Sequence, residues 1–185
     1  MKTIYIEGSS ETDNGNLRKA FSCLLKKELF GNMPRIIMGD GKNQTIDKFH
    51  STPVKPGERR FLLFDSDKAM PDKQLICQEY NDAKPNRKVD ATADNTFLMI
   101  QEVEAWILSQ PDILSAVGID VSKFNISDVE TISKPSEKLK ELYKHSNKVY
   151  TKVSEFVKIF PQLDSSRLKS SCPEYKSLIL ALSED

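Results

Sequence analysis

Residues Phe61-Leu-Leu-Phe-Asp-Ser-Asp67 place four consecutive apolar side chains directly before a pair of acids. A short apolar run that ends abruptly in polar residues is typical of a strand buried on both faces of a parallel sheet. Similar runs occupy residues 3–6 (Thr-Ile-Tyr-Ile), 35–38 (Arg-Ile-Ile-Met) and 97–100 (Phe-Leu-Met-Ile). The sequence therefore predicts a sheet of about four short strands.

The segments between these strands carry helical patterns. An apolar series from Leu17 to Leu25 has the spacing of an amphipathic helix, which we expect to end near Gly31. Shorter helices are expected around residues 46–49, 73–80 and 102–109. Strands that alternate with helices form βαβ units, so we predict an α/β fold with a mostly parallel sheet flanked by helices.

The last third of the chain has helical patterns only. Pro135 can begin a helix, and apolar residues at helical spacing mark two more, at residues 149–160 and 175–182. We therefore expect a single domain over residues 1–185, with an α/β core at 1–110 and a helical C-terminal extension at 111–185.

Composition disfavours several classes of protein. The 185 residues include 27 Lys plus Arg and 27 Asp plus Glu, so any contact with nucleic acid requires a local patch and not overall charge. No run approaches the ~20 apolar residues that span a bilayer, and residues 1–7 do not resemble a signal peptide. Three widely separated cysteines favour reduced thiols. We expect a cytoplasmic protein with no membrane contact.

Acids follow three of the predicted strands. Glu7, the pair Asp65 and Asp67, and Glu104 all come at or shortly after a strand's end. Because the carboxyl ends of parallel strands meet at one edge, we expect these acids to converge. Clustered carboxylates repel one another unless a cation neutralises them, and hard oxygen ligands favour Mg²⁺ or Mn²⁺. Each acid alone also has a simpler role, as a turn residue or a helix cap.

Spacing selects among neighbouring acids. Asp65 and Asp67 share a face if the strand reaches residue 67, and a turn could also direct both to one ion. Glu102 and Glu104 point about 200° apart on a helix, so only one can join the site. Gln101 and Glu104 share a helical face, which favours Glu104 as the ligand and Gln101 as its support.

The region from Lys134 to Lys158 is rich in lysine, with seven lysines against three glutamates. A solvated helical face explains such a bias. The alternative is a track for nucleic-acid phosphates, DNA or RNA, with contacts from Lys144, Lys148 and Lys152.

The acids and their flanking residues resemble a known signature. Glu7-Gly8 after a first strand and Asp65-x-Asp67 after a later one are similar to the Toprim motifs of topoisomerases, primases and related nucleases. The whole chain resembles more closely a family of small bacterial Toprim-like proteins described as a domain of unknown function. The resemblance rests on Ile6-Glu-Gly8, Leu17-Arg18, Met33-Pro-Arg-Ile36, Gly41-Lys42, Phe49, Leu63-Phe-Asp-Ser-Asp67, Leu98-Met-Ile-Gln101, Glu104-Ala-Trp106 and Tyr150-x-Lys152.

This resemblance implies a Toprim-like Rossmannoid fold, with Glu7 as general acid or base and Asp65 and Asp67 as metal ligands. Members are often encoded beside ATPases in apparent defence loci, which implies an ATPase partner protein. The family often has glutamate at position 67 and arginine at position 42, so Asp67 and Lys42 are variants of its pattern.

We therefore expect a Mg²⁺- or Mn²⁺-dependent phosphodiester hydrolase. Asp65, Asp67 and Glu104 would hold the metal, Glu7 would transfer protons, and Gly8 and Gln101 would support the site. Arg18 and Lys42 are candidate phosphate contacts. Two alternatives remain: a catalytically silent docking subunit of an ATPase complex, and a nucleotide-binding phosphotransfer enzyme.

Overall fold

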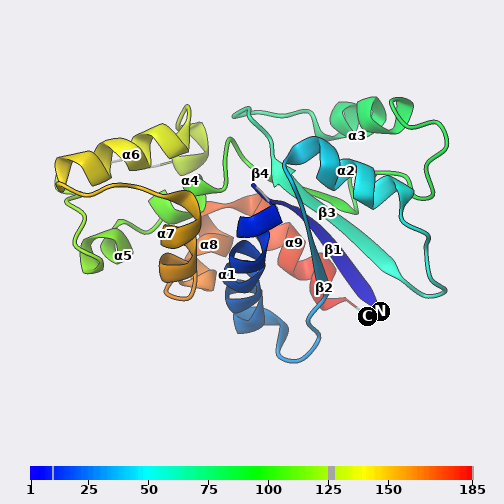
Figure 1. Cartoon of the computed structure of the whole chain (residues 1–185), viewed down its shortest axis with the longest axis horizontal. Helices are drawn as coiled ribbons and strands as arrows, with labels where there is room; N and C mark the ends of the chain where they lie inside the picture. The colour runs from blue at the N-terminus through cyan, green and yellow to red at the C-terminus, as the bar shows by residue number, and fades with distance from the viewer. Residues whose placement is uncertain (10, 125–127, 185) are drawn as a thin grey trace.

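A computed structural model describes residues 1–9, 11–124 and 128–184, and its centre is a four-stranded sheet in the order β2-β1-β3-β4 (Figure 1). The strands are β1 (Lys2–Glu7), β2 (Arg35–Gly39), β3 (Arg59–Asp65) and β4 (Thr96–Met99). Every neighbouring pair in this sheet is parallel. The predicted α/β class and four-stranded parallel sheet are confirmed.

Helices cover both faces of the sheet. Figure 1 shows α1 (Glu11–Leu29) and α9 (Pro173–Ser183) on one face, and α2 (Lys42–Ser51) and α3 (Lys73–Asp82) on the other. Along β1, Ile4 and Ile6 belong to the core on the α1 side, whereas Tyr5 belongs to the core on the α2 side. Burial on both faces explains why the strand sequences are continuously apolar rather than alternating.

The helical C-terminal part is also confirmed. The helix α4 (Glu104–Leu108) precedes it, and it contains α5 (Pro111–Ala116), the 3₁₀ turn η1 (Val129–Thr131), α6 (Pro135–His145), α7 (Lys152–Ile159), α8 (Ser165–Ser171) and α9. Trp106 of α4 is 2% exposed and has its ring centroid 5.0 Å from that of Tyr175 and 6.4 Å from that of Phe160. Phe160 in turn packs against Phe21 of α1. These aromatic contacts join the C-terminal helices to the core beside the sheet.

Several element boundaries differ from the sequence prediction. The helix expected at 102–109 begins at Glu104, because residues 100–103 form the turn that follows β4. The short helix α8 has no strong apolar pattern. Its N-terminus is fixed by Asp164, whose side chain accepts hydrogen bonds from the amides of Ser166 and Arg167.

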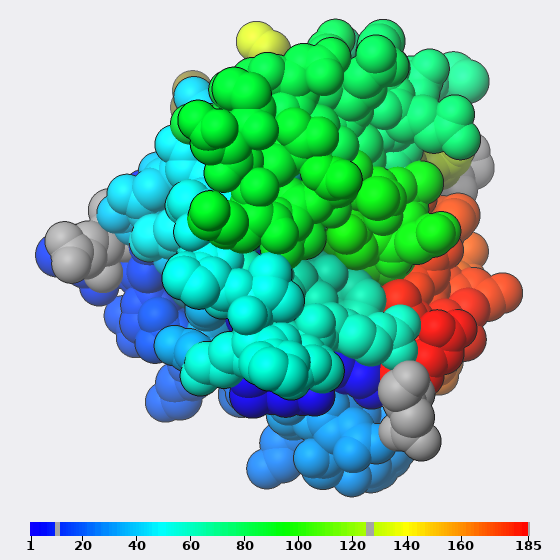
Figure 2. Space-filling view, turned by 90° about the vertical axis from the view of Figure 1, so that its right-hand side faces the viewer, coloured from blue at the N-terminus to red at the C-terminus, as the bar shows by residue number. Residues whose placement is uncertain are grey.

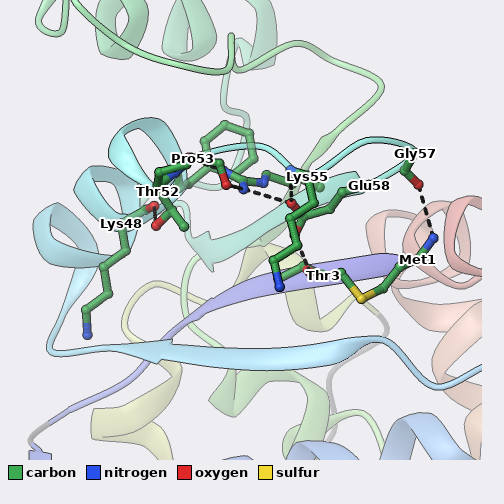
Figure 3. A network of polar contacts seen from close by, with 10 residues as sticks. Met1, Thr3, Lys48, Thr52, Pro53, Lys55, Gly57 and Glu58 are labelled. Atoms are coloured by element: carbon green, nitrogen blue, oxygen red, sulfur yellow. Dashed lines mark hydrogen bonds and ion pairs between the residues drawn. The ribbon is translucent and has the colours of Figure 1, made fainter.

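The amino end of the sheet is held by a buried ion pair between Arg60 and Glu58. Figure 3 labels Glu58 with its neighbours Thr3, Thr52 and Lys55. The Arg60 guanidinium donates to Glu58 Oε2 at 2.8 Å and to the carbonyl oxygen of Thr52 at 2.6 Å. Thr3 donates to the other Glu58 oxygen at 2.7 Å, and the Lys55 amide donates to Oε2 at 3.0 Å. The network therefore ties the α2–β3 connection to the starts of β1 and β3.

The long connection from α3 to β4 lies on the outside of the molecule, where Figure 2 shows it in green beside the α2–β3 connection in cyan. In the part of the chain that the structure describes, no helix has the length and apolar character needed to cross a membrane.

Candidate functional site

The candidate site lies where the strand order reverses. From β1 the chain passes through α1 to β2 on one side, and then through α2 to β3 on the other side of β1. In open α/β sheets this reversal separates the two crossover connections at the carboxyl ends of the central strands, and ligands bind in the resulting crevice. Here those ends are Glu7 of β1 and Asp65 of β3, and Glu7 Oε2 accepts a hydrogen bond from the Asp65 amide at 3.0 Å.

Asp65 is buried at this edge, with 8% of its surface exposed. Its Oδ1 accepts a hydrogen bond from the Val103 amide at 2.8 Å, which fixes the carboxylate against the turn after β4. Burial raises the pKa of Asp65 well above its ordinary value, and the nearby carboxylates of Glu7 and Glu104 raise it further. Burial also raises the pKa of Glu7, although the Asp65 amide opposes the shift.

Glu104 brings a third carboxylate to the cluster from the first turn of α4. It is 1% exposed, and its Oε1 accepts a hydrogen bond from the Tyr150 hydroxyl at 3.0 Å. Its Oε2 is buried and finds no hydrogen-bond partner among the described residues. An unpaired buried carboxylate oxygen is costly, so this atom marks a place where a further donor or a cation is expected.

Lys152 supplies the positive charge of the cluster. Its Nζ lies 3.3 Å from Glu104 Oε1 and 3.8 Å from Asp65 Oδ2. Burial opposes the charge of this lysine, but Glu104 and Asp65 outweigh that effect and raise the pKa of Lys152. The ammonium therefore remains charged between the two buried carboxylates.

Asp67 occupies a different environment from Asp65. The strand β3 ends at Asp65, and Asp67 lies in the following turn with a φ of +56° and a side chain that is 67% exposed. Its carboxylate contacts the Lys42 ammonium, which also lies 5.6 Å from the centre of the Phe64 ring. The structure thus pairs Asp67 with Lys42 at the rim of the site.

Gln101 supports the site through its backbone. It precedes α4 and has a φ of +62°, so the shared helical face expected for Gln101 and Glu104 does not exist. Instead the Gln101 amide donates to Ser66 Oγ at 2.8 Å, and the Gln101 carbonyl accepts from the Asp67 amide at 2.9 Å. The Glu102 carboxylate accepts a hydrogen bond from the Ser136 amide at 2.6 Å, at the start of α6.

Gly8 allows a tight approach between the ends of β1 and β2. A side chain at this position would collide with Asn14 Oδ1 and with the carbonyl oxygen of Gly39. Asn14 is buried and bridges the same turn: its Oδ1 accepts from the Ser9 amide at 3.2 Å, and its Nδ2 donates to the Gly39 carbonyl at 3.2 Å. Gly8 and Asn14 therefore set the path of the chain directly after Glu7.

The remaining candidate cations are distributed over the surface. Arg18 on α1 and Lys144 on α6 are exposed. Lys148 is exposed and donates to the carbonyl oxygen of Val117 at 2.7 Å. Of the three lysines expected to form a phosphate track, the structure brings Lys152 into contact with the carboxylates and leaves the other two outside the cluster.

A groove of about 680 Å³ adjoins Lys152 between the N-terminal parts of α1 and α7. Its walls carry mostly small polar and valine side chains: Ser9, Asp13, Asn16, Thr151, Val153, Ser154 and Val157, with Lys152 itself. A ligand in this groove would therefore lie next to the ammonium that contacts the carboxylates.

The cluster suits a divalent cation in its chemistry but not in its present arrangement. Carboxylate oxygens are the preferred ligands of Mg²⁺ and Mn²⁺, and Glu104 Oε2 is a buried oxygen without a partner. Across the described ranges, however, no group of three His, Cys, Asp or Glu side chains is placed to hold a metal ion. The Lys152 ammonium now lies between two of the candidate ligands.

Sequence reasoning missed two supporting roles. Asn14 and the hydroxyl of Tyr150 each make hydrogen bonds that orient the site, but neither follows a strand or stands in a spacing pattern. For Tyr150 the only signal was the family resemblance that includes Tyr150-x-Lys152.

The comparisons with known proteins agree with the predicted membership of a family of unknown function. Neither the curated proteins nor the solved structures gave a match to this chain. A family model described as "Domain of unknown function (DUF4276)" matches residues 6–183, a span that includes every candidate residue of the site. The chain therefore belongs to the DUF4276 family.

Proposed function

We propose that the protein is a Mg²⁺- or Mn²⁺-dependent phosphodiester hydrolase of Toprim-like type. The observation that carries this proposal is the convergence of Glu7, Asp65 and Glu104 at the reversal point of the parallel sheet, with Lys152 as their shared cation. The substrate class follows from the Toprim resemblance together with the charge of this site.

The charge balance supports a need for additional positive charge. The cluster has three carboxylates, and the Lys152 ammonium contacts two of them. Lys42 is paired with Asp67 and also lowers the pKa of Glu7, but burial outweighs this effect. The raised pKa values of Glu7 and Asp65 reflect burial of these acids with too little compensating charge. A divalent cation would offset the excess negative charge that remains.

Asp65 and Glu104 are the residues best placed to hold such a cation, with Asp67 available at the rim. When bound, the ion would polarise a phosphoryl oxygen and lower the pKa of a bound water. The Val103 amide orients Asp65, and the Tyr150 hydroxyl orients Glu104.

Glu7 is the candidate for proton transfer. Its pKa is raised by burial, and its Oε2 is held by the Asp65 amide at the carboxyl end of β1, where a positioned general acid or base would be needed. Lys42, at the rim of the site, is the candidate contact for the substrate phosphate, and Arg18 on α1 is a more distant one.

A catalytically silent docking subunit, for example of an ATPase complex, is the second candidate function. The observation that favours it is the ion pairing of Lys152 with Asp65 and Glu104, because a site already neutralised in part has less need of a metal. In that case the cluster would be a structural feature of the sheet edge.

Substitution of Asp65 by asparagine separates the two functions. We expect Asp65→Asn to weaken Mn²⁺ binding, measured by calorimetry, by at least about tenfold, or roughly 1.4 kcal/mol, and to abolish Mn²⁺-dependent cleavage of DNA or RNA. The fold should persist because the substitution removes one of several clustered negative charges. Asp82→Asn, at an exposed position at the end of α3, is the matched control and should change neither property. Unchanged metal binding in Asp65→Asn, or no cleavage by the wild type of single- or double-stranded DNA or of RNA, would favour the docking subunit.

A further inference from the structure

We propose that Lys152 is an exchangeable internal cation: its ammonium occupies the place of the divalent ion, and binding of that ion turns the lysine into the groove between α1 and α7. This inference rests on the proposed metal-dependent function and adds to it the order in which the site is filled.

The contacts of Lys152 support the proposal that its ammonium occupies the place of a divalent ion. Its ammonium touches Glu104 Oε1 at 3.3 Å and lies 3.8 Å from Asp65 Oδ2, so it bridges the two acids that are best placed to bind a metal. Ligands that are engaged by an ammonium cannot at the same time close around a divalent ion.

The exposure of the three side chains supports exchange rather than permanent pairing. The side chain of Lys152 is 37% exposed, whereas those of Asp65 and Glu104 are 11% and 1% exposed. The lysine can therefore leave by rotation of its own flexible stem, and the acids remain fixed by the Val103 amide and the Tyr150 hydroxyl. Buried carboxylates without a cation are unfavourable, and either the ammonium or a divalent ion would supply the missing positive charge at this place.

The groove between α1 and α7 can hold the Lys152 ammonium once it has left the carboxylates. Lys152 is the first residue of α7 and lines this cavity of about 680 Å³ together with Thr151, Ser154 and Ser9. Hydroxyl groups there can accept hydrogen bonds from a displaced ammonium. A phosphate group that enters the groove would meet a free lysine only after the metal has bound, which predicts that the metal binds first and the phosphate second.

Removal of the lysine charge tests the exchange directly. In Lys152→Met, Mn²⁺ has no ammonium to displace, so we expect its affinity to rise by at least about tenfold, roughly 1.4 kcal/mol, when binding is followed by loss of the free Mn²⁺ EPR signal. The metal-free variant should melt at a lower temperature than the wild type, and Mn²⁺ should raise its melting temperature by more. Lys144→Met, which removes an exposed lysine from α6, is the matched control and should leave both quantities unchanged.

The outcomes separate this inference from the proposed function. Equal or weaker Mn²⁺ binding by Lys152→Met than by the wild type would overturn the exchange and leave the metal site standing. No Mn²⁺ binding by either protein would overturn the metal-dependent function and the exchange with it.

A second measurement uses the wild type and does not depend on the folding of a variant. In protein labelled with ¹⁵N at the lysine side chains, Mg²⁺ should shift the Nζ resonance of Lys152 and leave that of Lys144 unchanged. A Lys152 resonance that stays fixed at saturating Mg²⁺ would overturn the exchange.

Discussion

Glu7 differs from the other acids of the cluster in how its carboxylate is held. Its Oε2 accepts the Asp65 amide across two adjacent strands, and the side chain remains half-buried rather than enclosed. A group that is fixed in position but still reached by solvent is suited to exchange protons.

We predict that Glu7→Gln separates binding from turnover. The amide is nearly isosteric and Asp65 and Glu104 remain, so Mn²⁺ affinity should change little, whereas Mn²⁺-dependent cleavage should fall by roughly 10²–10⁴-fold, the usual contribution of a positioned general acid or base. Calorimetry and a single-turnover cleavage assay measure the two effects. Loss of metal binding in Glu7→Gln would instead identify Glu7 as a ligand.

The gathering of Glu7, Asp65 and Glu104 could be predicted from sequence, because each of these acids lies at or shortly after the carboxyl end of a buried strand. What this position could not predict is the partner of each acid. Asp67 pairs with Lys42, and Lys152 enters from a helix more than forty residues after Glu104, through tertiary packing that leaves no local pattern. The helical face expected for Gln101 and Glu104 does not exist, because Gln101 has a positive φ and lies before the helix.

Among the elements, the connection from β1 to α1 determines where Glu7 lies. Gly8 donates to the Gly39 carbonyl at 3.0 Å and accepts from the Gly41 amide at 3.2 Å, so this turn links the ends of β1 and β2. The Asn14 side chain fills the space that a larger residue at position 8 would require.

We predict that Gly8→Ala destabilises the protein by about 1–3 kcal/mol, the usual cost of overpacking, because the new methyl group meets a backbone carbonyl as well as Asn14. Mn²⁺-dependent cleavage should also fall, since Glu7 must move. Gly15→Ala in α1 is the matched control: its Cβ has no neighbour within 4 Å, and it should stabilise the helix by about 0.5–1 kcal/mol. Urea denaturation checks both values, and equal stability of the two variants would contradict this account of the turn.

The lysines around α6 and α7 differ in their contacts, because Lys152 lies near the carboxylates of Asp65 and Glu104. We predict that Lys144→Gln with Lys148→Gln reduces the slope of log affinity against log salt for DNA or RNA by ~0.7–0.9 per lost phosphate contact. Mn²⁺ affinity should be unaffected, because neither lysine touches the carboxylates. Binding to a labelled oligonucleotide over a range of salt concentrations gives the slope. An unchanged slope would identify these lysines as a solvated face of the helices.

At the scale of the whole molecule, the two ends of the sheet differ in how their buried acids are compensated. At the carboxyl end the acids outnumber their cations, whereas at the amino end Glu58 is matched by Arg60 and by further hydrogen bonds. Burial opposes the charge of Glu58, but the hydrogen bonds from Arg60, the Lys55 amide and Thr3, with the charge of Arg60, together outweigh it and lower the pKa of Glu58 from 4.5 to about 2.

The lowered pKa of Glu58 predicts how its contribution to the stability of the fold depends on pH. Because the pKa of Glu58 is lower in the folded than in the unfolded chain, its contribution is fully present above pH 4.5 and is lost as the pH falls from 4.5 towards 2. Glu58→Gln should therefore cost on the order of 2–3 kcal/mol at pH 7 and progressively less below pH 4.5. Glu79→Gln, on the exposed side of α3, should cost little at any pH. Denaturation at several pH values tests this, and a cost of Glu58→Gln that does not depend on pH would contradict it.

The sequence predicts the architecture better than it predicts the details of the C-terminal part. Four continuous apolar runs separated by helical patterns allow few arrangements other than a parallel α/β sheet. The short helices α5 and α8 and the pairing of Trp106 with Tyr175 depend on contacts between distant segments, which no local pattern encodes.

A crystal of the wild-type protein soaked in Mn²⁺ tests the central claim most directly, because the anomalous signal of manganese locates the ion without reference to activity. We predict a peak within coordinating distance of Asp65 and Glu104, near Glu7, with the Lys152 ammonium moved away from both carboxylates. A cluster without a peak at saturating Mn²⁺, with Lys152 still in contact with Glu104, would contradict the account.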